Sequence, residues 1–372
     1  MTGPVVVVGG GIGGLTTALG LVSRGIDVTV HERAPELCEI GAGLGVWPAP
    51  QAVFDRLGIG DKVLELAGPW KTAGLRRSDG SYIVRIPIED LRARLGGATI
   101  GVHRAELQAL LLGALPDGVV RTGQELVGLE EDGGSLTVTF ADGTSTAAWA
   151  VVGADGLRSR TRELLFGPRR LRRCRMAAWR GTASPGDRDW GNFAGETWGP
   201  TGRFGILPIA GRVTWYAAAR RFTNGAGKDE LLRRFGDWHH PIPDLIAATE
   251  PDQIWCDQVH DIRPLRHWSK GRVTLLGDAA HAMTPDLGQG ACQAILDAWA
   301  LADALATHVD VLGAFDAYER ARKGRARIVA MIARAMTNGA GEGRAAVAIR
   351  SSLTRRVPVG AALSALAFVA KA

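Results

Sequence analysis

The sequence is short of cysteine and of basic blocks, and both shortages exclude classes of protein. Its four cysteines, Cys38, Cys174, Cys256 and Cys292, are scattered and form no C-x-x-C pair. The scatter argues against a disulfide scaffold or a metal site and is typical of a reducing cytosol, so we expect a cytoplasmic protein without a metal. No basic block is interleaved with stacking aromatics, which argues against nucleic-acid binding.

A long hydrophobic run is also lacking. The chain does not open on a basic region followed by an apolar signal core, so we expect no secretory peptide. The apolar segment 357–372 is shorter than a membrane span requires, and we expect no transmembrane segment. We expect this segment to be a helix that packs or contacts a second copy, with a membrane-surface anchor as the alternative. A monomer and a homodimer both remain open.

Arginine and glycine, by contrast, are abundant. Six lysines leave 38 of the 44 basic residues as arginine, and the net charge is +6. Biased codon composition is one explanation, and attraction of anionic cofactors and substrates is the other. At 372 residues, with 46% hydrophobic and 22% charged residues, the chain has room for two substructures of a globular enzyme. Several of the 50 glycines fall in clusters.

The first cluster is a G-x-G-x-x-G motif near the N-terminus. The run Val5–Val8 predicts a buried strand, followed by a glycine-rich turn, a helix and a second strand. Gly9 permits the turn, Gly11 lets backbone approach a pyrophosphate, and Gly14 lets the helix pack closely. Glu32, at the end of the second strand, is placed to accept ribose hydroxyls. The set predicts a dinucleotide site, and the glutamate favours FAD or NAD.

The second cluster lies at 151–162, where Asp155, Gly156, Ser159 and Arg162 follow the order D-G-x-x-S-x-x-R. Taken alone, this pattern is typical of a strand that ends in a D-G turn and of a helix that Ser159 caps. It gains a functional interpretation only together with the other two clusters.

The third cluster is GDAAHAMTPDLGQG, residues 277–290, which leads from a buried strand into an apolar helix. Small residues at Gly288 and Gly290 let a flat ring approach the backbone. The helix N-terminus beyond them supplies partial positive charge, which suits the anionic side of a reduced flavin. Asp278 is placed to accept a hydrogen bond from a ribityl or ribose hydroxyl, although a strand end and helix cap would also explain it.

The three clusters, in this order, resemble the motifs of the para-hydroxybenzoate hydroxylase family of FAD-dependent monooxygenases, from Val5 to about Ala306. The resemblance implies that the first binds the ADP part of FAD, the second contacts FAD and serves NAD(P)H, and the third holds the ribityl chain. It also implies a second FAD contact within 41–50, an FAD contact by Arg104 and a backbone contact to adenine at Leu126.

The candidate cofactor-binding residues come from these motifs and smaller matches. They are Gly9, Gly11, Gly13, Gly14, Glu32, Arg33, Gly43, Arg104, Leu126, Asp155, Asp278, Pro285, Gly288, Gln289, Gly290 and Ala291. The chain departs from the family at Cys292, where many members have asparagine, and at Leu296, where many have an acidic residue. We expect altered packing behind the flavin at these positions rather than lost chemistry.

The resemblance implies an α/β fold, with a Rossmann-like FAD-binding domain, a mixed-sheet substrate domain and C-terminal helices. The expected FAD-binding domain comprises residues 1–70, 101–168 and 256–340. The expected substrate domain comprises residues 71–100 and 169–255, and the expected helical tail comprises residues 341–372. The implied reaction uses NAD(P)H and O2 to hydroxylate an aromatic or heteroaromatic small molecule through a flavin C4a-hydroperoxide.

Four residues are candidates for the catalytic site. Arg203 precedes a strand expected to enter the pocket, where it would hold a carboxylate or phenolate through two hydrogen bonds. Trp215 and Tyr216 are neighbours in a strand, so they point to opposite faces and only one can meet the substrate. The Tyr216 hydroxyl would polarise a substrate phenol, and Pro285 would line the flavin side of the pocket. Ordinary packing is the alternative for each aromatic residue.

Three further residues have weaker claims on the site. Trp179 would form a wall of the substrate pocket or part of the core. Trp47 would flank the flavin ring or pack in the core. We interpret His281, which is common in this segment of the family, as structural.

Three other functions compete with aromatic hydroxylation. An epoxidase acting on an isoprenoid or polyene would share the fold and the cofactor. A flavoprotein reductase would not use O2 productively. A descendant that binds a lipid or a protein without catalysis is disfavoured because all three FAD motifs are intact.

Overall fold

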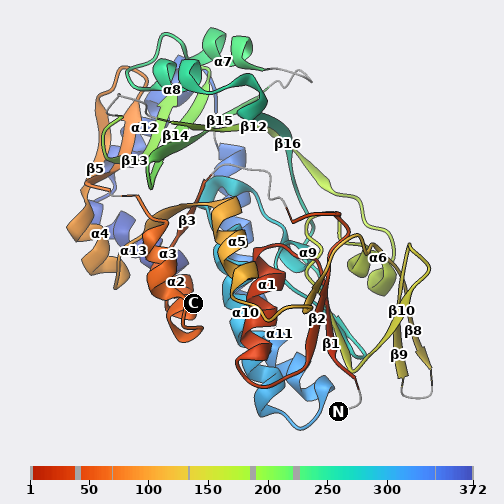
Figure 1. Cartoon of the computed structure of the whole chain (residues 1–372). Coiled ribbons are helices and arrows are strands. Elements are labelled where there is room, and N and C mark those ends of the chain that lie inside the picture. The colour runs from red at the N-terminus through yellow and green to blue at the C-terminus, as the bar shows by residue number, and fades with distance from the viewer. Residues whose placement is uncertain are drawn as a thin grey trace.

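The computed structural model describes residues 3–37, 43–68, 70–132, 135–184, 190–220, 227–339 and 341–370. Figure 1 shows a mixed α/β molecule in which a seven-stranded sheet under α7 and α8 stands above a six-stranded sheet packed on helices. The predicted fold class is confirmed, with helices at the C-terminal end of the chain.

The elements follow the chain in the order of their numbers. The strands are β1 (Val5–Val8), β2 (Val28–His31), β3 (Gly43–Val46), β4 (Thr72–Arg77), β5 (Tyr82–Pro87), β6 (Ile100–His103), β7 (Val120–Arg121), β8 (Leu126–Asp132), β9 (Ser135–Phe140), β10 (Ser145–Ala148), β11 (Ala150–Gly153), β12 (Arg172–Ala183), β13 (Phe193–Gly199), β14 (Gly202–Ile209), β15 (Arg212–Ala219), β16 (Ile254–Asp261), β17 (Ser269–Lys270) and β18 (Val273–Leu275). The helices are α1 (Ile12–Val22), α2 (Pro48–Arg56), α3 (Gly60–Glu65), α4 (Ile88–Leu95), α5 (Arg104–Gly113), α6 (Arg160–Phe166), α7 (Lys228–Phe235), α8 (Ile242–Ala248), α9 (Asp278–His281), α10 (Gly290–Thr307), α11 (Val311–Gly339), α12 (Arg344–Arg356) and α13 (Val359–Ala370), with short 3-10 turns η1 (Pro251–Gln253) and η2 (Pro285–Leu287).

The six-stranded sheet holds the N-terminal strand at its centre. Its order is β17-β18-β11-β1-β2-β7, and β1 runs parallel to both β11 and β2. The valines Val5–Val8 are at most 4% exposed because strands flank β1 on both sides and other elements cover both faces. A continuous run of β-branched residues is what such a strand requires.

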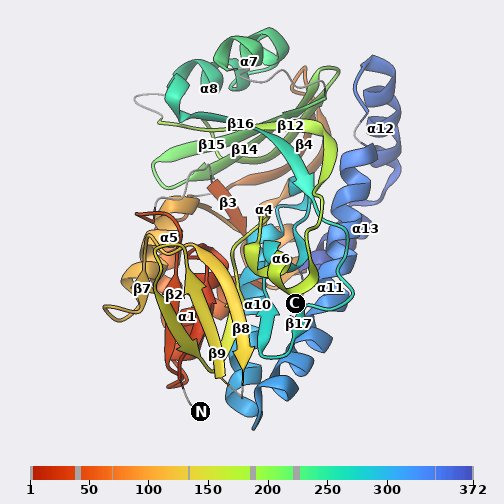
Figure 2. The ribbon, with the colours of Figure 1, turned by 90° about the vertical axis from the view of Figure 1, so that its right-hand side faces the viewer.

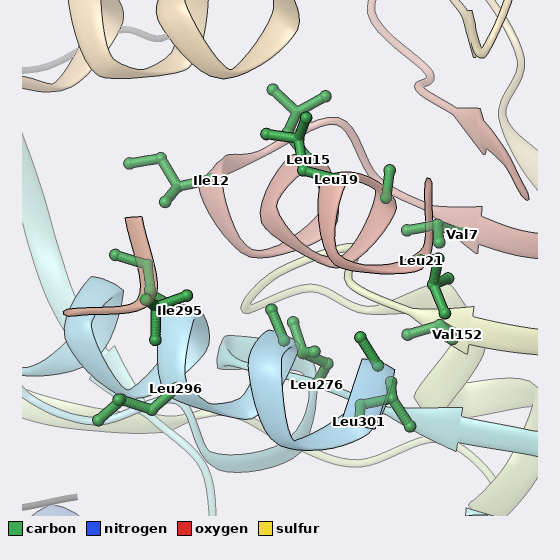
Figure 3. Packing of buried hydrophobic residues seen from close by; sticks show 14 of the residues in the cluster. Val7, Ile12, Leu15, Leu19, Leu21, Val152, Leu276, Ile295, Leu296 and Leu301 are labelled. Carbon is green, nitrogen blue, oxygen red and sulfur yellow. The ribbon is translucent and has the colours of Figure 1, made fainter. Parts of the chain in front are cut away.

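Helices α1 and α10 pack against each other beside this sheet, with apolar side chains between them (Figure 3). Leu15 and Leu301 are fully buried there. Each such side chain contributes about 1.5–3 kcal/mol relative to exposure. The helices approach closely because Gly20 faces Ala302: a Cβ atom at Gly20 would lie 2.9 Å from the Ala302 Cβ. Packing of α1 on α10 therefore fixes the glycine-rich motif against the third cluster.

The seven-stranded sheet has the order β16-β12-β15-β14-β13-β4-β5. One face packs against α7 and α8 through an apolar core that includes Phe204 and Phe235, both fully buried. Because side chains alternate along a strand, Arg203 and Gly205 point to the opposite face. Contacts of β14 with β3 and β6 join this sheet to the lower part of the molecule.

The six-stranded sheet draws its strands from the regions expected to bind FAD. Strand β16, however, pairs with β12 over Ile254–Asp261 in the seven-stranded sheet, so it crosses the boundary expected between residues 255 and 256. The domain bounds therefore stay a prediction.

The C-terminal helices lie against the body of the chain. Helix α12 contacts β5 and β13, and α13 contacts α4. Ala367 and Ala370 are buried against Leu91 and Leu95, as expected if the apolar tail packs. Within the ranges the structure describes, no helix combines the length and the apolar character needed to cross a membrane.

Candidate active site

The glycine-rich turn between β1 and α1 tolerates no side chain at two positions. Gly9 has φ +111°, and a Cβ atom there would lie 2.5 Å from the Ala154 carbonyl oxygen. A Cβ atom at Gly14 would overlap with the Gly9 carbonyl oxygen. Gly13 packs closely too, since its Cβ would lie 2.8 Å from Leu276 Cδ2. Gly11 is the residue that precedes α1, so the turn presents backbone N–H groups at the positive end of this helix.

Glu32 lies beside this turn at the end of β2. Its Oε2 accepts a hydrogen bond from the Gly10 N–H (2.7 Å) and its Oε1 from the Ala34 N–H (2.9 Å). Each carboxylate oxygen has a second lone pair, and the residue is only half-buried, so ribose hydroxyls can still donate to it. Arg33 is exposed next to it. The predicted ribose contact is compatible with this geometry.

Gln108 is a residue of this site that the sequence analysis missed. It is 5% exposed, and its Nε2 donates to the Gly10 carbonyl oxygen at 2.9 Å. Gln108 follows Arg104 by four residues on α5, so the two share one face of the helix. Arg104 itself is exposed at the start of that helix. The i, i+4 spacing from a candidate FAD contact is the signal that would have found Gln108.

The second cluster forms the helix cap that was the alternative interpretation. The Asp155 carboxylate accepts from Ser159 Oγ (2.5 Å) and from the Thr161 N–H (2.8 Å). Ser159 Oγ in turn accepts from the Arg162 N–H at 2.9 Å and caps α6. Asp155 remains half-buried. A contact of Asp155 with FAD stays a prediction.

Arg162 joins the second cluster to the third. Its side chain is buried, with Nη2 donating to the Leu157 carbonyl oxygen (2.6 Å) and Nη1 to the Ala279 carbonyl oxygen (2.9 Å). Burial lowers the pKa of Arg162. Nearby carboxylates oppose this effect, and that of Asp155 opposes it most. The cluster therefore positions α9.

The third cluster presents open backbone at the start of α10, an 18-residue helix. Gly288 has φ +60°, and a Cβ atom there would meet nothing within 4 Å. At Gly290 the nearest atom to such a Cβ would be Asp278 Oδ1, at 3.9 Å. Pro285 and Asp278 are exposed. A planar group can therefore reach the helix N-terminus here, with a carboxylate beside it.

Gln289 adds a donor to this surface. It is 2% exposed, and its Nε2 has no hydrogen-bond partner among the residues that the structure describes. An unpaired buried amide is costly, so such a group marks a position where a ligand can supply the acceptor. Ala291 follows in the first turn of α10, where backbone N–H groups lack acceptors within the helix. This arrangement fits the ring and ribityl chain of FAD.

A buried network behind this surface holds the segment in place. The Asp297 carboxylate lies 2.5 Å from His281 Nε2 and accepts from Arg322 Nε at 2.8 Å. Burial raises the pKa of Asp297, but His281 and Arg322 outweigh it and the pKa is lowered. His281 is buried, in keeping with its interpretation as structural.

The two departures from the family pattern lie in the same helix. Cys292 is fully buried, and its Sγ donates to the Gly45 carbonyl oxygen at 3.3 Å. Burial raises the pKa of this thiol to about 12, so it is not a nucleophile at neutral pH. Leu296 is 7% exposed in the core. Both residues pack.

Side chains on the lower face of the seven-stranded sheet form the opposite wall. Tyr216 on β15 lies across β14 to reach β13, where its hydroxyl donates to Glu196 Oε1 at 3.0 Å. The ring passes over Gly205, and a Cβ atom at that position would overlap with it. Tyr216 remains 40% exposed. Partial burial of this side chain and the Glu196 carboxylate raise the pKa of Tyr216 well above its ordinary value of 10, so the phenol is protonated at neutral pH.

Arg203 links this wall to the third cluster. Its Nη2 donates to Asp286 Oδ1 at 2.6 Å, and its Nη1 lies 3.4 Å from Glu196 Oε1. Burial lowers the pKa of Arg203, but Glu196 and Asp286 outweigh it and the pKa is raised. The guanidinium already serves two protein carboxylates, and only 8% of the side chain is exposed. A contact of Arg203 with a substrate carboxylate or phenolate stays a prediction.

Trp215 and Trp179 pack in the core of the seven-stranded sheet, which was the alternative interpretation for each. Trp215 is 1% exposed on the helix-covered face, where its Nε1 donates to Thr249 Oγ1 at 2.9 Å. Trp179 is fully buried in the same core. Of the neighbouring pair, Tyr216 is thus the residue on the open face. Trp47 packs against the cluster that includes Leu91 and Leu95.

Two of the remaining candidates have structural contacts of their own. The Gly43 N–H donates to Thr214 Oγ1 at 2.8 Å, and a Cβ atom at Gly43 would lie 2.5 Å from Thr214 Cγ2, so β3 approaches the seven-stranded sheet closely. Residues 41–42 of the expected second FAD segment lie outside the described residues. Leu126 is 3% exposed at the start of β8. FAD contacts at Gly43 and Leu126 stay predictions.

A protein-family model and known relatives both match most of this chain. The model of the FAD binding domain family matches residues 2–333. An aurachin C monooxygenase/isomerase of Stigmatella aurantiaca is 36% identical over 327 residues, 87% of this chain and 85% of the relative. A FAD-dependent urate hydroxylase of Klebsiella pneumoniae is 33% identical over 344 residues, 88% of both chains.

A solved structure agrees over almost the whole chain. The crystal structure of Klebsiella pneumoniae HpxO complexed with FAD and uric acid superposes with a TM-score of 0.91 at 29% identity, covering 99% of this chain and 96% of the other. Cofactor type and fold thus agree with the geometry of the glycine turn and of the α10 N-terminus. The chain belongs to the FAD binding domain family and, within it, to the FAD-dependent monooxygenases of the para-hydroxybenzoate hydroxylase type.

Proposed function

We propose that this chain uses FAD, NAD(P)H and O2 to hydroxylate an aromatic or heteroaromatic small molecule. The observation that carries the proposal is the meeting of two unlike surfaces at one ion pair. Asp286, in the loop that begins at Pro285, binds Arg203 of the seven-stranded sheet at 2.6 Å. The open backbone at the start of α10 and the Tyr216 face therefore lie on either side of one junction.

The FAD-binding residues would act mainly through the backbone. The turn that contains Gly9 and Gly11 would bind the pyrophosphate, and Glu32 the adenosine ribose. Asp278 and the segment from Gly288 to Gly290 would hold the ribityl chain and ring. Reduced FAD, when bound, supplies the electrons that activate O2 for transfer of one oxygen atom to the substrate.

The start of α10 would stabilise negative charge on the ring. Its free N–H groups and its positive dipole end point toward the open surface at Gly290. Gln289 Nε2 would find there the acceptor that the described residues do not provide. Such preorganised donors act without reorganisation when charge develops, which is why they contribute strongly to catalysis.

The Tyr216 face would orient the substrate. The phenol donates a hydrogen bond to Glu196, so the lone pairs of its oxygen are free to accept from a substrate O–H or N–H. The ion pairs of Glu196 and Asp286 with Arg203 would keep the Tyr216 hydroxyl aligned. Because Arg203 is buried between them, the junction also limits the entry of water from this side.

The names of two relatives agree with this class of substrate. One is an aurachin C monooxygenase/isomerase and another a urate hydroxylase, and urate is a heteroaromatic compound. The two names give different substrates, so the class rather than a single compound is proposed here.

The test measures NADH and NADPH oxidation by the purified yellow protein with phenols, hydroxybenzoates, indoles, quinolones and purines. We expect one class to accelerate oxidation several-fold and to yield a product heavier by one oxygen atom. Slow oxidation that no compound changes, with all electrons recovered as peroxide, would contradict the proposal. It would then favour a reductase or an epoxidase acting on a polyene.

A further inference from the structure

Helix α12 brings the Arg350 side chain to the face of the seven-stranded sheet that carries Tyr216 and Arg203. Figure 2 shows α7 and α8 above the sheet and α12 beside it, and α12 contacts β13 and β5. The Arg350 guanidinium carbon lies 4.1 Å from the centroid of the Trp198 ring. Trp198 Nε1 donates to Glu196 Oε2 at 2.5 Å. Because Trp198 and Glu196 are two residues apart in β13, they share the face that carries Arg203.

Arg350 is half-buried and keeps two buried donors without a partner, one more than Arg203 or Arg162. Its Nε and Nη2 are buried and have no hydrogen-bond partner among the described residues. By comparison, Arg203 pairs with two carboxylates and Arg162 donates to three carbonyl oxygens, and among the described residues each leaves only its Nε without a partner. A buried unpaired donor on a charged group is costly. Two of them on one guanidinium therefore mark a place for a planar acceptor from outside the chain.

The charges around Arg350 favour an anion at that acceptor position. Burial lowers the pKa of Arg350, Glu196 opposes this effect, and Arg203 adds to it, so both residues are close enough to interact with it. Glu196 and Asp286 both pair with Arg203, so two negative charges offset this guanidinium. The anionic end of a ligand would then turn toward Arg350.

We propose that Arg350 is a substrate-binding residue that receives the anionic oxygen atoms of an aromatic acid, so that α12 forms part of the substrate pocket. The inference rests on the proposed function for the identity of the ligand as substrate. The aromatic ring would extend from Arg350 toward Tyr216, whose oxygen accepts a hydrogen bond from the ring hydroxyl.

Calorimetric titration of the FAD-loaded enzyme tests the proposal without catalysis. The probes are two acid and amide pairs, 4-hydroxybenzoate with 4-hydroxybenzamide and salicylate with salicylamide. We expect the unmodified enzyme to bind an acid more tightly than its amide. Arg350→Gln should lose about 10- to 100-fold in affinity for that acid and little for the amide. Arg350→Lys, which keeps the charge but not the planar fork, should lie between the two.

Arg356→Gln is the matched control, because Arg356 ends the same helix and is exposed. It should bind both probes as the unmodified enzyme does, and thermal unfolding and FAD content should be alike in all variants. The Michaelis constant for NAD(P)H should not change in Arg350→Gln. A rise in that constant alone would assign the guanidinium to the nicotinamide cofactor and overturn the proposal.

Three other results would also overturn it: no acid binds, acids bind no better than amides, or Arg350→Gln binds acids normally. Failure of the proposed function is distinguishable from these results. If no compound stimulates NAD(P)H oxidation, the hydroxylase proposal fails, while acid binding still decides the role of Arg350. If only neutral compounds stimulate oxidation, the hydroxylase proposal stands and the role of Arg350 fails.

Discussion

The FAD side of the site is built from backbone, whereas the substrate side is built from side chains. The FAD side consists of backbone in glycine turns and at helix starts, in which Gly9 and Gly14 leave no space for a Cβ atom. The substrate side consists of the side chains Tyr216, Glu196 and Arg203, which come from three adjacent strands of one sheet. A backbone site depends on where side chains are absent, whereas a side-chain site depends on which residues meet.

This difference shows why a shared cofactor coexists with different substrates in one fold. Backbone groups are the same in every sequence, so a turn that fits a pyrophosphate persists as long as its glycines do. Side chains on adjacent strands can change one at a time while the sheet remains. Four substitutions or pH experiments separate the two walls, in order of decreasing expected effect.

The largest effect should come from Gly14→Ala on the FAD side. The new Cβ atom would overlap with the Gly9 carbonyl oxygen, so either the turn or α1 must move. We expect protein without bound FAD, detected by loss of the flavin absorbance after purification. Gly113→Ala is the control, since Gly113 ends α5 and its Cβ would meet nothing within 4 Å. A yellow Gly14→Ala protein with unchanged FAD affinity would contradict the backbone account.

Next in size should be Arg203→Leu at the junction. The change leaves the buried carboxylates of Glu196 and Asp286 without their cation, which costs about 3–5 kcal/mol. Urea unfolding of the FAD-loaded protein should show this loss. Arg92→Leu breaks an exposed pair with Glu89 at 3.4 Å and should cost no more than about 1 kcal/mol. Equal losses of unfolding free energy in the two variants would mean that the Arg203 ion pairs stabilise the protein no more than an exposed pair does.

A smaller and more selective effect is expected when Tyr216 or its neighbour Trp215 is replaced. Tyr216→Phe removes a hydrogen bond to a carboxylate worth about 1.5–3 kcal/mol and should lower kcat/KM by roughly 10- to 100-fold. FAD content should not change. Trp215→Phe, on the covered face, should lower the unfolding temperature while kcat/KM stays near normal. Steady-state kinetics and thermal unfolding of both variants would separate the two faces. A loss of kcat/KM in Trp215→Phe but not in Tyr216→Phe would contradict the assignment of Tyr216 to the substrate side.

The smallest effect concerns His31, in the strand that leads to Glu32. Burial lowers the pKa of His31, and its ring stacks on Phe140 with centroids 4.4 Å apart. A lowered pKa means that the unfolded state binds the proton more tightly, so this contribution to stability is present above about pH 6.5 and is lost as pH falls below it.

Urea unfolding between about pH 8 and pH 5 measures this effect. The unmodified protein should lose stability toward acid, and His31→Gln should lose less. His267→Gln, which changes a largely exposed imidazole, should follow the unmodified protein. Identical slopes for all three proteins would remove His31 from the account.

The FAD side was largely predictable from the sequence because its signals are local. The strand, turn and helix around Gly9 follow from β-branched and glycine spacing within 30 residues, and the fold class follows from the three clusters together. The capping role of Asp155 and Ser159 was foreseen as an alternative for the same reason. Gln108 was missed because its contact with Gly10 spans 98 positions in the chain.

The substrate side was predictable only in part. Alternation along β15 correctly placed Trp215 and Tyr216 on opposite faces but did not say which face was open. Arg203 was found, yet its partners were not, because Asp286 is 83 positions away and its pairing depends on how the loop meets the sheet. Nothing local in the sequence of α12 connects Arg350 with Trp198.

The most direct measurement is a crystal structure of the FAD-loaded enzyme with the compound that most accelerates NAD(P)H oxidation. The account predicts that the flavin ring lies at the start of α10 and that the substrate ring lies between it and the Tyr216–Glu196–Arg203 face. A substrate ring bound on the face beneath α7 and α8, or remote from Tyr216, would contradict it.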